Sequence, residues 1–98
     1  MNMQQIMAQA QKMQKDIEKK QKELEAMEFI GESELVDITL YGDKTIKSVN
    51  LKNKSNFDEE DLECLEDMIK IAFNSAISKI NAETQKKMGA YSKLGGLF

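Results

Sequence analysis

The sequence contains no proline, histidine, tryptophan or arginine, and it has one cysteine, Cys64. Without histidine the chain has no imidazole that could act as a base near neutral pH. One cysteine can neither close an internal disulfide nor supply a zinc site, and no partner base is available to make Cys64 a nucleophile. No glycine-rich loop that could cradle a phosphate is visible either. We therefore expect a protein that is not an enzyme and that needs no metal, cofactor or small-molecule substrate.

Long hydrophobic runs are missing as well. The opening residues, MNMQQIMAQAQ, are too polar for the core of a signal peptide, and no apolar run approaches the roughly 20 residues that span a bilayer. The apolar face of this first segment also lacks the aromatic anchors of a helix that lies on a membrane surface. A lone reduced thiol suits the reducing cytosol. The sequence predicts a soluble, cytoplasmic protein without a membrane partner.

What the chain does contain is charge, and the charge is unevenly distributed. The 98 residues support one domain, residues 1–98, with a net charge of −3. A domain of this size buries little more than about 60% of the surface of its unfolded chain, so a lone monomer would be marginally stable. Residues 58–67 carry seven acids and no base, whereas residues 68–98 carry five lysines against Glu83 alone. Net charge is therefore a poor guide to nucleic-acid binding here.

Two stretches have helical periodicity. Apolar residues recur at steps of three and four from Met3 to Met27, interrupted only by Lys20, which predicts an amphipathic helix over residues 3–27. A second apolar stripe, at positions 62, 65, 69, 72, 73, 76, 77 and 80, predicts a helix over residues 58–88. The acidic residues at its N-terminal end are favoured there by the helix dipole. Residues 89–98 are expected to form a flexible tail.

The segment between the helices has the alternation of β-strands. In VDITLYGDKTIKSVNLK, apolar and polar residues alternate on both sides of a turn at Gly42 and Asp43, which predicts a hairpin. Ile46 is out of phase with Val49 and Leu51, and this indicates a β-bulge. A third strand is predicted around residues 29–33. The fold class is thus α+β, with two long helices flanking a small antiparallel sheet.

The lengths of these elements predict an oligomer. The helices would be roughly 37 Å and 46 Å long, but a seven-residue strand covers only about 23 Å. Both helices therefore overhang the sheet, and the simplest cover for their apolar seams is the same seam on a second copy. We expect a homodimer. The residues assigned to the core or the dimer seam are Ile6, Ala10, Met13, Ile17, Leu24, Ile69, Phe73 and Ile77.

The first helix carries its lysines in a pattern. On a helical wheel Lys12, Lys15, Lys19 and Lys22 form one arc opposite the apolar seam, and every acid of the helix lies outside that arc. Such a pattern is either the solvated face of an ordinary helix or an edge that follows phosphates, because four cations without neighbouring carboxylates suit counterion release. The residues alone leave both interpretations open.

A second basic region lies at the end of the second helix. Beyond Ile80 the apolar stripe stops, so this end is expected to project into solvent and to be basic through Lys79, Lys86 and Lys87. The spacing of Glu83 and Lys87 also fits a plain ion pair one turn apart. The absence of arginine removes the fork that commonly binds guanine, so any DNA binding should have weak sequence selectivity.

The order of elements and three strings resemble the YbaB/EbfC family of bacterial nucleoid-associated proteins. The strings are MQQIMAQAQKMQKDIEKKQKELEAMEF, GESELVDITLYG and LEDMIKIAFNSAISKINAETQKKMG, and the last is the most specific. The resemblance implies an α-β-β-β-α protomer, a tweezer-like homodimer, and binding of double-stranded DNA linked to nucleoid organisation or gene regulation. By position, it implies DNA contacts for the lysines in QKMQKDIEKKQK and in TQKK, and a packing role for AFNSA.

A protein-interaction adaptor is the alternative function. Met-rich helical surfaces adapt well to partners, and the acidic segment DEEDLECLED could recruit one. The two functions predict different pull-down results, because an adaptor should keep its protein partners after nuclease treatment and a DNA-binding protein should lose the partners that were held through nucleic acid.

Overall fold

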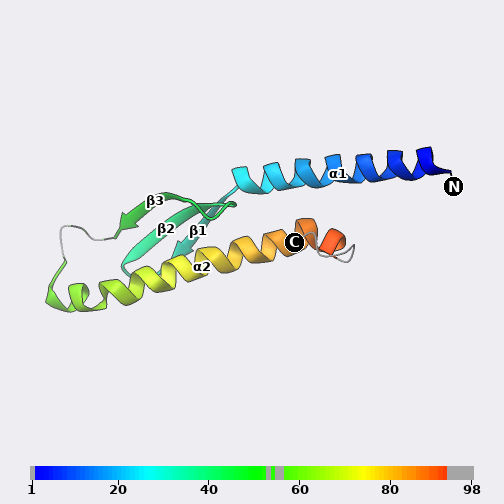
Figure 1. Cartoon of the computed structure of the whole chain (residues 1–98). Coiled ribbons are helices and arrows are strands. Elements are labelled where there is room, and N and C mark those ends of the chain that lie inside the picture. Colours follow the sequence, from blue (N-terminus) through cyan, green and yellow to red (C-terminus); the bar gives the residue numbers. More distant parts are fainter. Residues whose placement is uncertain (1, 53, 55–56, 93–98) are drawn as a thin grey trace.

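The structure is a computed structural model that describes residues 2–52, 54 and 57–92. The elements, in chain order, are α1 (Met3–Ala26), β1 (Glu28–Glu32), β2 (Val36–Tyr41), β3 (Ile46–Leu51) and α2 (Glu59–Ser92). The predicted α+β class and the α-β-β-β-α order are confirmed (Figure 1). The molecule is elongated, with extents of 70 × 19 × 14 Å, because α1 leaves one end of the sheet and the acidic end of α2 passes the other.

The helix boundaries follow from local hydrogen bonds. Asn2 caps α1: its Oδ1 accepts the backbone N–H of Gln5 at 2.9 Å, while the Gln5 side chain accepts the N–H of Asn2. Asp58 acts in the same way before α2, accepting the N–H of Asp61 at 2.8 Å. The second helix continues to Ser92, beyond the predicted end at Met88. The rest of the predicted tail, residues 93–98, lies outside the described residues.

The sheet is antiparallel, in the order β1-β2-β3. Its register contains the predicted bulge: Thr39 pairs with Ser48 but Leu40 pairs with Ile46, so Lys47 is an extra residue on β3. The bulge shifts the phase of β3 by one residue and thereby returns Ile46 to the face that carries Val49. The β-bulge at Lys47 therefore explains why Ile46 is out of phase in the sequence pattern.

The turn between β2 and β3 is held by its own polar groups. The Tyr41 N–H donates to the Thr45 carbonyl at 2.9 Å, and the Asp43 carboxylate accepts hydrogen bonds from both the hydroxyl and the N–H of Thr45. These bonds hold the pKa of Asp43 below its ordinary value. Lys44 has a φ of 71°, in the left-handed region. Gly42 lies against the end of α1, where a Cβ would come within 1.8 Å of the Leu24 carbonyl oxygen.

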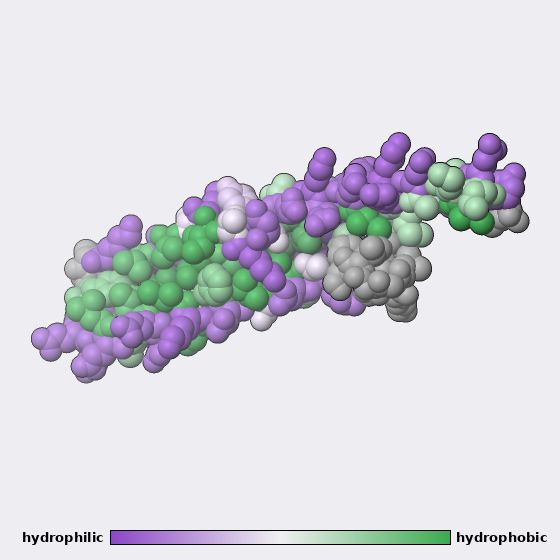
Figure 2. All heavy atoms as spheres, viewed as in Figure 1, coloured by the Kyte–Doolittle hydropathy of each residue, from purple (hydrophilic) through white to green (hydrophobic). Residues whose placement is uncertain are grey.

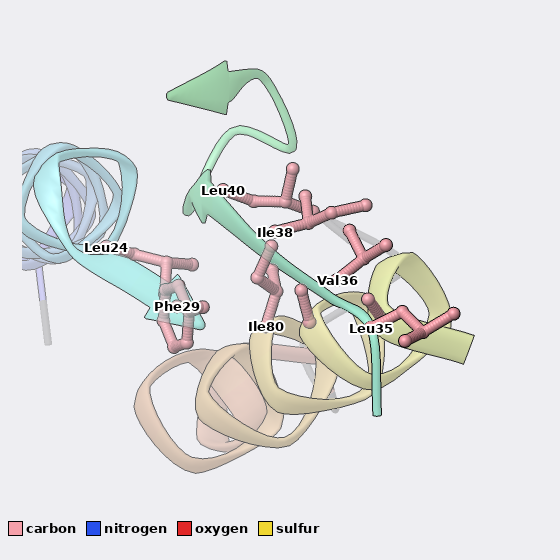
Figure 3. Packing of buried hydrophobic residues seen from close by; sticks show 9 residues of the cluster. Leu24, Phe29, Leu35, Val36, Ile38, Leu40 and Ile80 are labelled. Carbon is pink, nitrogen blue, oxygen red and sulfur yellow. The ribbon is translucent and has the colours of Figure 1, made fainter. Parts of the chain in front are cut away.

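The core lies between α2 and the inner face of β1 and β2. Figure 3 shows the side chains of Val36, Ile38 and Leu40 on the side of the sheet that Ile80 approaches from α2. The helix approaches β1 closely, since a Cβ on Gly31 would lie 1.8 Å from the Ala72 carbonyl oxygen. Small residues at Ala72 and Ala76, both fully buried, permit this distance. The AFNSA segment is therefore part of the packing core, as the family resemblance implied.

The predicted seam divides into covered and uncovered parts. In α1 the structure buries Leu24 alone, and Ile17 is half-buried, while Ile6 and Met13 remain 50% and 39% exposed. Ala10 is exposed as well. In α2, Phe73 and Ile77 pack at the edge of the core and Ile69 is 40% exposed. Both helices overhang the sheet, as their lengths predicted (Figure 1).

The C-terminal part of α2 differs from expectation. It does not project freely: Met88 is 2% exposed, and Glu83, Thr84 and Lys87 are half-buried. This part of α2 contacts α1 and runs beside it (Figure 1). The apolar stripe stops at Ile80, but contact with the first helix continues, so the stripe was an incomplete guide to which segments are covered.

Candidate nucleic-acid interface

The lysines of the predicted arc lie on the outside of α1. Lys12, Lys15, Lys19 and Lys22 are all exposed, and within the described part of the chain none of them takes part in an ion pair or a hydrogen bond. We call these four residues the lysine stripe. Figure 2 shows hydrophilic side chains along one side of α1, several of them reaching away from the helix. The ammonium groups of the stripe are therefore open to solvent and to a polyanion.

The geometry of α1 sets the spacing of these charges. From Lys12 to Lys22 the helix rises roughly 15 Å. Each strand of duplex DNA carries one phosphate charge for about every 3.4 Å of the axis, so the stripe spans the length of about four phosphates on one strand. Leu24, the buried residue of α1, lies at the end of the helix that adjoins the sheet, and the N-terminal half of the helix extends away from the sheet (Figure 1). The stripe therefore begins on a part of α1 that the sheet does not obstruct.

Acids flank the stripe without pairing with it. One shallow hollow of about 210 Å³ is lined by Gln11, Gln14, Lys15 and Glu18. Another, of about 380 Å³, is lined by Gln9, Lys12, Met13 and Asp16. These carboxylates share a groove with the neighbouring lysines and lower the local positive potential, so the expectation of cations without neighbouring carboxylates is wrong, although the carboxylates form no ion pair with the lysines. The stripe is thus a single positive edge bordered by negative charge, which favours a narrow contact with one phosphate backbone.

The lysines at the C-terminal end of α2 have different surroundings. The Lys79 ammonium donates a hydrogen bond to the Ile30 carbonyl on β1, and Lys87 lies 4.0 Å from Glu83, the pair that the sequence spacing allowed. Lys86 is exposed and has no such partner among the described residues. Sequence reasoning missed the structural bond of Lys79, because its acceptor is 49 residues away along the chain.

Lysines of the hairpin also serve the fold. Lys47 pairs with Glu28 across the sheet, and the hydrogen bond and charge of Glu28 raise the pKa of Lys47. Lys52 lies 3.1 Å from Asp37 and donates to the Ser33 carbonyl at 2.8 Å. The lysine stripe differs from these bound lysines, because no group in the described part of the protomer holds its cations.

Comparison with known proteins identifies the family of the chain. A family model described as the YbaB/EbfC DNA-binding family matches residues 1–96. The chain belongs to this family. It is 50% identical, over 94 residues and 94% of each chain, to proteins named nucleoid-associated protein from Streptococcus pneumoniae strains Hungary19A-6 and CGSP14 and from the serotype 4 strain TIGR4. The suspected family resemblance is confirmed.

Over residues 2–52, 54 and 57–92 no three histidine, cysteine, aspartate or glutamate side chains gather in a way that could hold a metal ion. None of the helices formed by these residues has the length and apolar character needed to cross a membrane. Cys64 is exposed on the acidic part of α2. The lysine stripe is the feature of the described surface that best matches the family's DNA-binding name.

Proposed function

We propose that this YbaB/EbfC-family chain is a homodimeric nucleoid-associated protein that binds double-stranded DNA through the lysine stripe, with weak sequence selectivity. The observation that supports this proposal most directly is the exposure of four unpaired ammonium groups along one edge of α1. The protein would act on the nucleoid in the cytoplasm and contribute to its organisation or to gene regulation.

The proposed mechanism is electrostatic. Each lysine that contacts a phosphate releases condensed counterions, and this gain falls as salt rises. Two stripes in a dimer offer eight lysines, which gives a slope of log K against log salt of about −7 if every lysine contacts a phosphate. Lysine is a point charge without the fork of arginine, so these contacts position the protein without distinguishing base pairs. Weak selectivity follows.

The C-terminal part of α2 supplies secondary contacts in this proposal. Lys86 is exposed and unpaired, so it can reach a phosphate without giving up another bond. Lys79 and Lys87 would first have to leave Ile30 and Glu83. Their share of the affinity is therefore smaller than that of the stripe.

The homodimer is supported by the apolar side chains that the protomer leaves exposed. Ile46 and Val49 on β3 are 57% and 52% exposed, and Ile71 on α2 is 50% exposed. Single exposed apolar residues are ordinary, but sets of them on two elements are typical of interaction surfaces. A second copy is the partner that the symmetry of common oligomers favours.

A gel-shift series of one duplex against salt tests the DNA proposal. The variant Lys12→Gln/Lys15→Gln/Lys19→Gln is compared with Lys44→Gln/Lys54→Gln/Lys70→Gln, in which three other exposed lysines are removed. Both variants change the net charge by the same amount. We expect the first to bind at least tenfold more weakly and with a shallower salt slope, and the second to stay close to the parent. Equal loss of duplex affinity in both variants would show that only net charge matters and would refute the role of the lysine stripe in DNA binding.

An adaptor function is the second candidate, and one observation favours it. Leu62 is 60% exposed within the acidic residues 58–67, at the end of the molecule remote from the tip of α1. A basic, apolar segment of another protein would suit this surface. A pull-down with and without nuclease tests it: protein partners that persist after nuclease treatment support an adaptor, and partners that vanish with the nucleic acid count against one.

A further inference from the structure

The first turns of α1 carry no charged side chain. Residues 2–11 contain neither an acid nor a lysine, whereas nine of the 15 residues from Lys12 to Ala26 are charged. All of residues 2–11 are exposed. Because exposed positions of a helix ordinarily include charged residues, this segment differs from the rest of the helix. We call residues 2–11 the uncharged tip.

Acids are missing from a place where a helix ordinarily favours them. The positive end of the helix dipole stabilises carboxylates in the first turn. The second helix follows this rule with Glu59, Glu60 and Asp61, but α1 has no acid in its first turn. Its cap uses the neutral side chains of Asn2 and Gln5 instead. The uncharged tip can therefore approach a polyanion without the repulsion that the start of α2 would meet.

The lysine stripe continues onto the uncharged tip as a line of amide and small side chains. Residues three or four apart lie on the same side of a helix. Steps of four, three, four, four and three join Gln4, Ala8, Gln11, Lys15, Lys19 and Lys22. These side chains fall within roughly 80° of the helical wheel. Gln11 and Lys15 also line one hollow together. We call Gln4, Ala8 and Gln11, the uncharged continuation of the stripe, the amide ridge.

The two amides of this ridge are available to a ligand. Gln4 and Gln11 are exposed, and over the described residues neither side chain takes part in a hydrogen bond. Gln5 differs, because its side-chain oxygen accepts the N–H of Asn2 in the cap. Each free amide offers an acceptor oxygen and two N–H donors on the same planar group. The ridge can therefore donate and accept hydrogen bonds at both positions.

The uncharged tip has the width needed to enter a groove of DNA. Figure 1 shows the first turns of α1 reaching past the described end of α2. A single helix with its side chains is about 10–12 Å across, and the major groove of duplex DNA is about 12 Å wide. From Gln4 to Gln11 the helix rises about 10 Å, the length of about three base-pair steps. The two amides can therefore contact separate base pairs of one short site.

An amide distinguishes base pairs in the major groove. Adenine presents an acceptor, N7, beside a donor, the N6 amino group, and a glutamine amide pairs with both at once. Guanine presents two acceptors there, and the amide oxygen pairs with neither. The small side chain of Ala8 leaves room for Gln4 and Gln11 to reach the base edges, and its methyl suits contact with the thymine methyl. Contacts of this kind favour A·T pairs.

We propose that Gln4 and Gln11 bind adenine edges in the major groove while the adjoining lysine stripe holds one phosphate backbone. This inference rests on the proposed DNA binding and supplies the source of its limited selectivity. Phosphate contacts carry most of the affinity and no sequence information, whereas base contacts carry the selectivity. With two amides against four lysines in each protomer, the preference for A·T pairs is real but small.

An adenine analogue tests the base contacts. 7-Deazaadenine lacks the N7 acceptor but keeps its pairing with thymine. Gel shifts at one salt concentration compare an A·T-containing duplex with the same duplex carrying the analogue. We expect the parent to bind the analogue duplex at least threefold more weakly, and Gln4→Ala/Gln11→Ala to bind both duplexes equally. The control Gln9→Ala/Gln14→Ala, which removes two exposed glutamines from other sides of α1, should keep the preference of the parent.

The outcomes of this experiment are decisive in both directions. Equal binding of the two duplexes by the parent would overturn the proposal. A preference that survives in Gln4→Ala/Gln11→Ala, or that disappears in Gln9→Ala/Gln14→Ala, would overturn it as well. Neither double variant changes the charge, and both replace glutamine by a stronger helix former. Far-ultraviolet circular dichroism establishes that each variant keeps its helices.

Two single acids test the approach of the uncharged tip to DNA. Ala8→Glu places a carboxylate on the amide ridge, and Gln9→Glu places one at an exposed position about 100° further around the helix. We expect Ala8→Glu to bind duplex at least tenfold more weakly and Gln9→Glu less than threefold more weakly, because only the first carboxylate faces the DNA. Equal loss of affinity in the two variants would overturn the assignment of the ridge.

Salt dependence separates this inference from the proposed function. Gln4→Ala/Gln11→Ala should keep the salt slope of the parent, since it loses no phosphate contact. If the slope falls in the variant of Lys12, Lys15 and Lys19 but the parent does not distinguish the adenine analogue, the base contacts are refuted and the DNA proposal stands. If that lysine variant binds duplex like the parent, the role of the stripe is refuted, whatever the effect of the analogue.

Discussion

The two helices have similar sequence patterns but different roles in the protomer. Both carry an apolar stripe at steps of three and four, yet α1 buries only Leu24, whereas α2 buries Ala72, Ala76 and Ile80 against the sheet. Their lysines differ in the same way: those of the stripe on α1 are unpaired, while Lys79 and Lys87 are bound. An apolar stripe therefore indicates that one face of a helix is buried in the folded protein, but it does not identify the surface that buries that face.

The largest expected effect is at the contact that makes α2 the core helix. Gly31→Ala would place a Cβ 1.8 Å from the backbone oxygen of Ala72, and neither backbone can yield cheaply. We expect the free energy of unfolding to fall by about 3 kcal/mol or more. Gly89→Ala is the matched control, because its Cβ would meet only the flexible Gln85 side chain and helix propensity favours alanine. Denaturant unfolding at one protomer concentration measures both, and equal effects would contradict the packing described.

The next effect separates the covered and uncovered parts of α1. Leu24→Ala should cost about 2–5 kcal/mol, because Leu24 is 6% exposed and packs with the core. Ile6→Ala should change stability by less than about 0.5 kcal/mol, since its side chain is 50% exposed. Thermal or denaturant unfolding of the two variants measures the difference. The comparison breaks if Ile6→Ala is as costly as Leu24→Ala, which would mean that the α1 seam is covered in solution.

A smaller effect separates the free lysines from the bound ones. Lys15→Gln should reduce the salt slope of duplex binding by about 1 for each phosphate that the side chain no longer reaches, and it should leave stability unchanged. Lys79→Gln should lower the free energy of unfolding by about 1 kcal/mol, because it removes the bond to Ile30, with little change in the slope. Gel shifts at increasing salt measure the slope of duplex binding for each variant, and thermal unfolding measures its stability. A greater weakening of DNA binding by Lys79→Gln would reverse the roles assigned to the two helices.

The smallest effect concerns the caps. Asn2→Ala and Asp58→Ala each remove the side chain that accepts an N–H at the start of a helix, worth about 1 kcal/mol. Because the first turns of α1 have no tertiary cover, we expect Asn2→Ala to act mainly by local fraying, seen as faster hydrogen exchange at residues 3–6 without a shift of the global transition. A global shift from Asn2→Ala would indicate that this end is covered in solution.

Much of the fold could be predicted because its signals are local. Alternation in β2, the out-of-phase Ile46 and the long apolar stripes each depend on neighbours a few residues apart, and each corresponds to an observed element or to the bulge. The end of α2 was predicted too early, at Met88, although the helix continues through Gly89 to Ser92. The third strand was less clear in the sequence, since Gly31 interrupts its apolar pattern where the strand approaches Ala72.

The candidate site was only partly predictable. The stripe could be found because a helical wheel places its four lysines without knowledge of the rest of the protein. The state of Lys79 could not, since the carbonyl that binds it belongs to β1. The exposure of Ile46 and Val49 on β3 was hidden as well, because they have the same pattern as residues that are covered.

The sequence by itself determined the elements, their order, the bulge and the segregation of lysines on α1, since periodicity and charge order are properties of a few consecutive turns or strand residues. Only the tertiary structure decided that α2 covers β1 and β2 while leaving Ile46 and Val49 of β3 exposed, and which lysines are bound. Those outcomes depend on contacts between residues far apart in the chain, where the small residues Gly31, Ala72 and Ala76 set how closely helix and sheet approach.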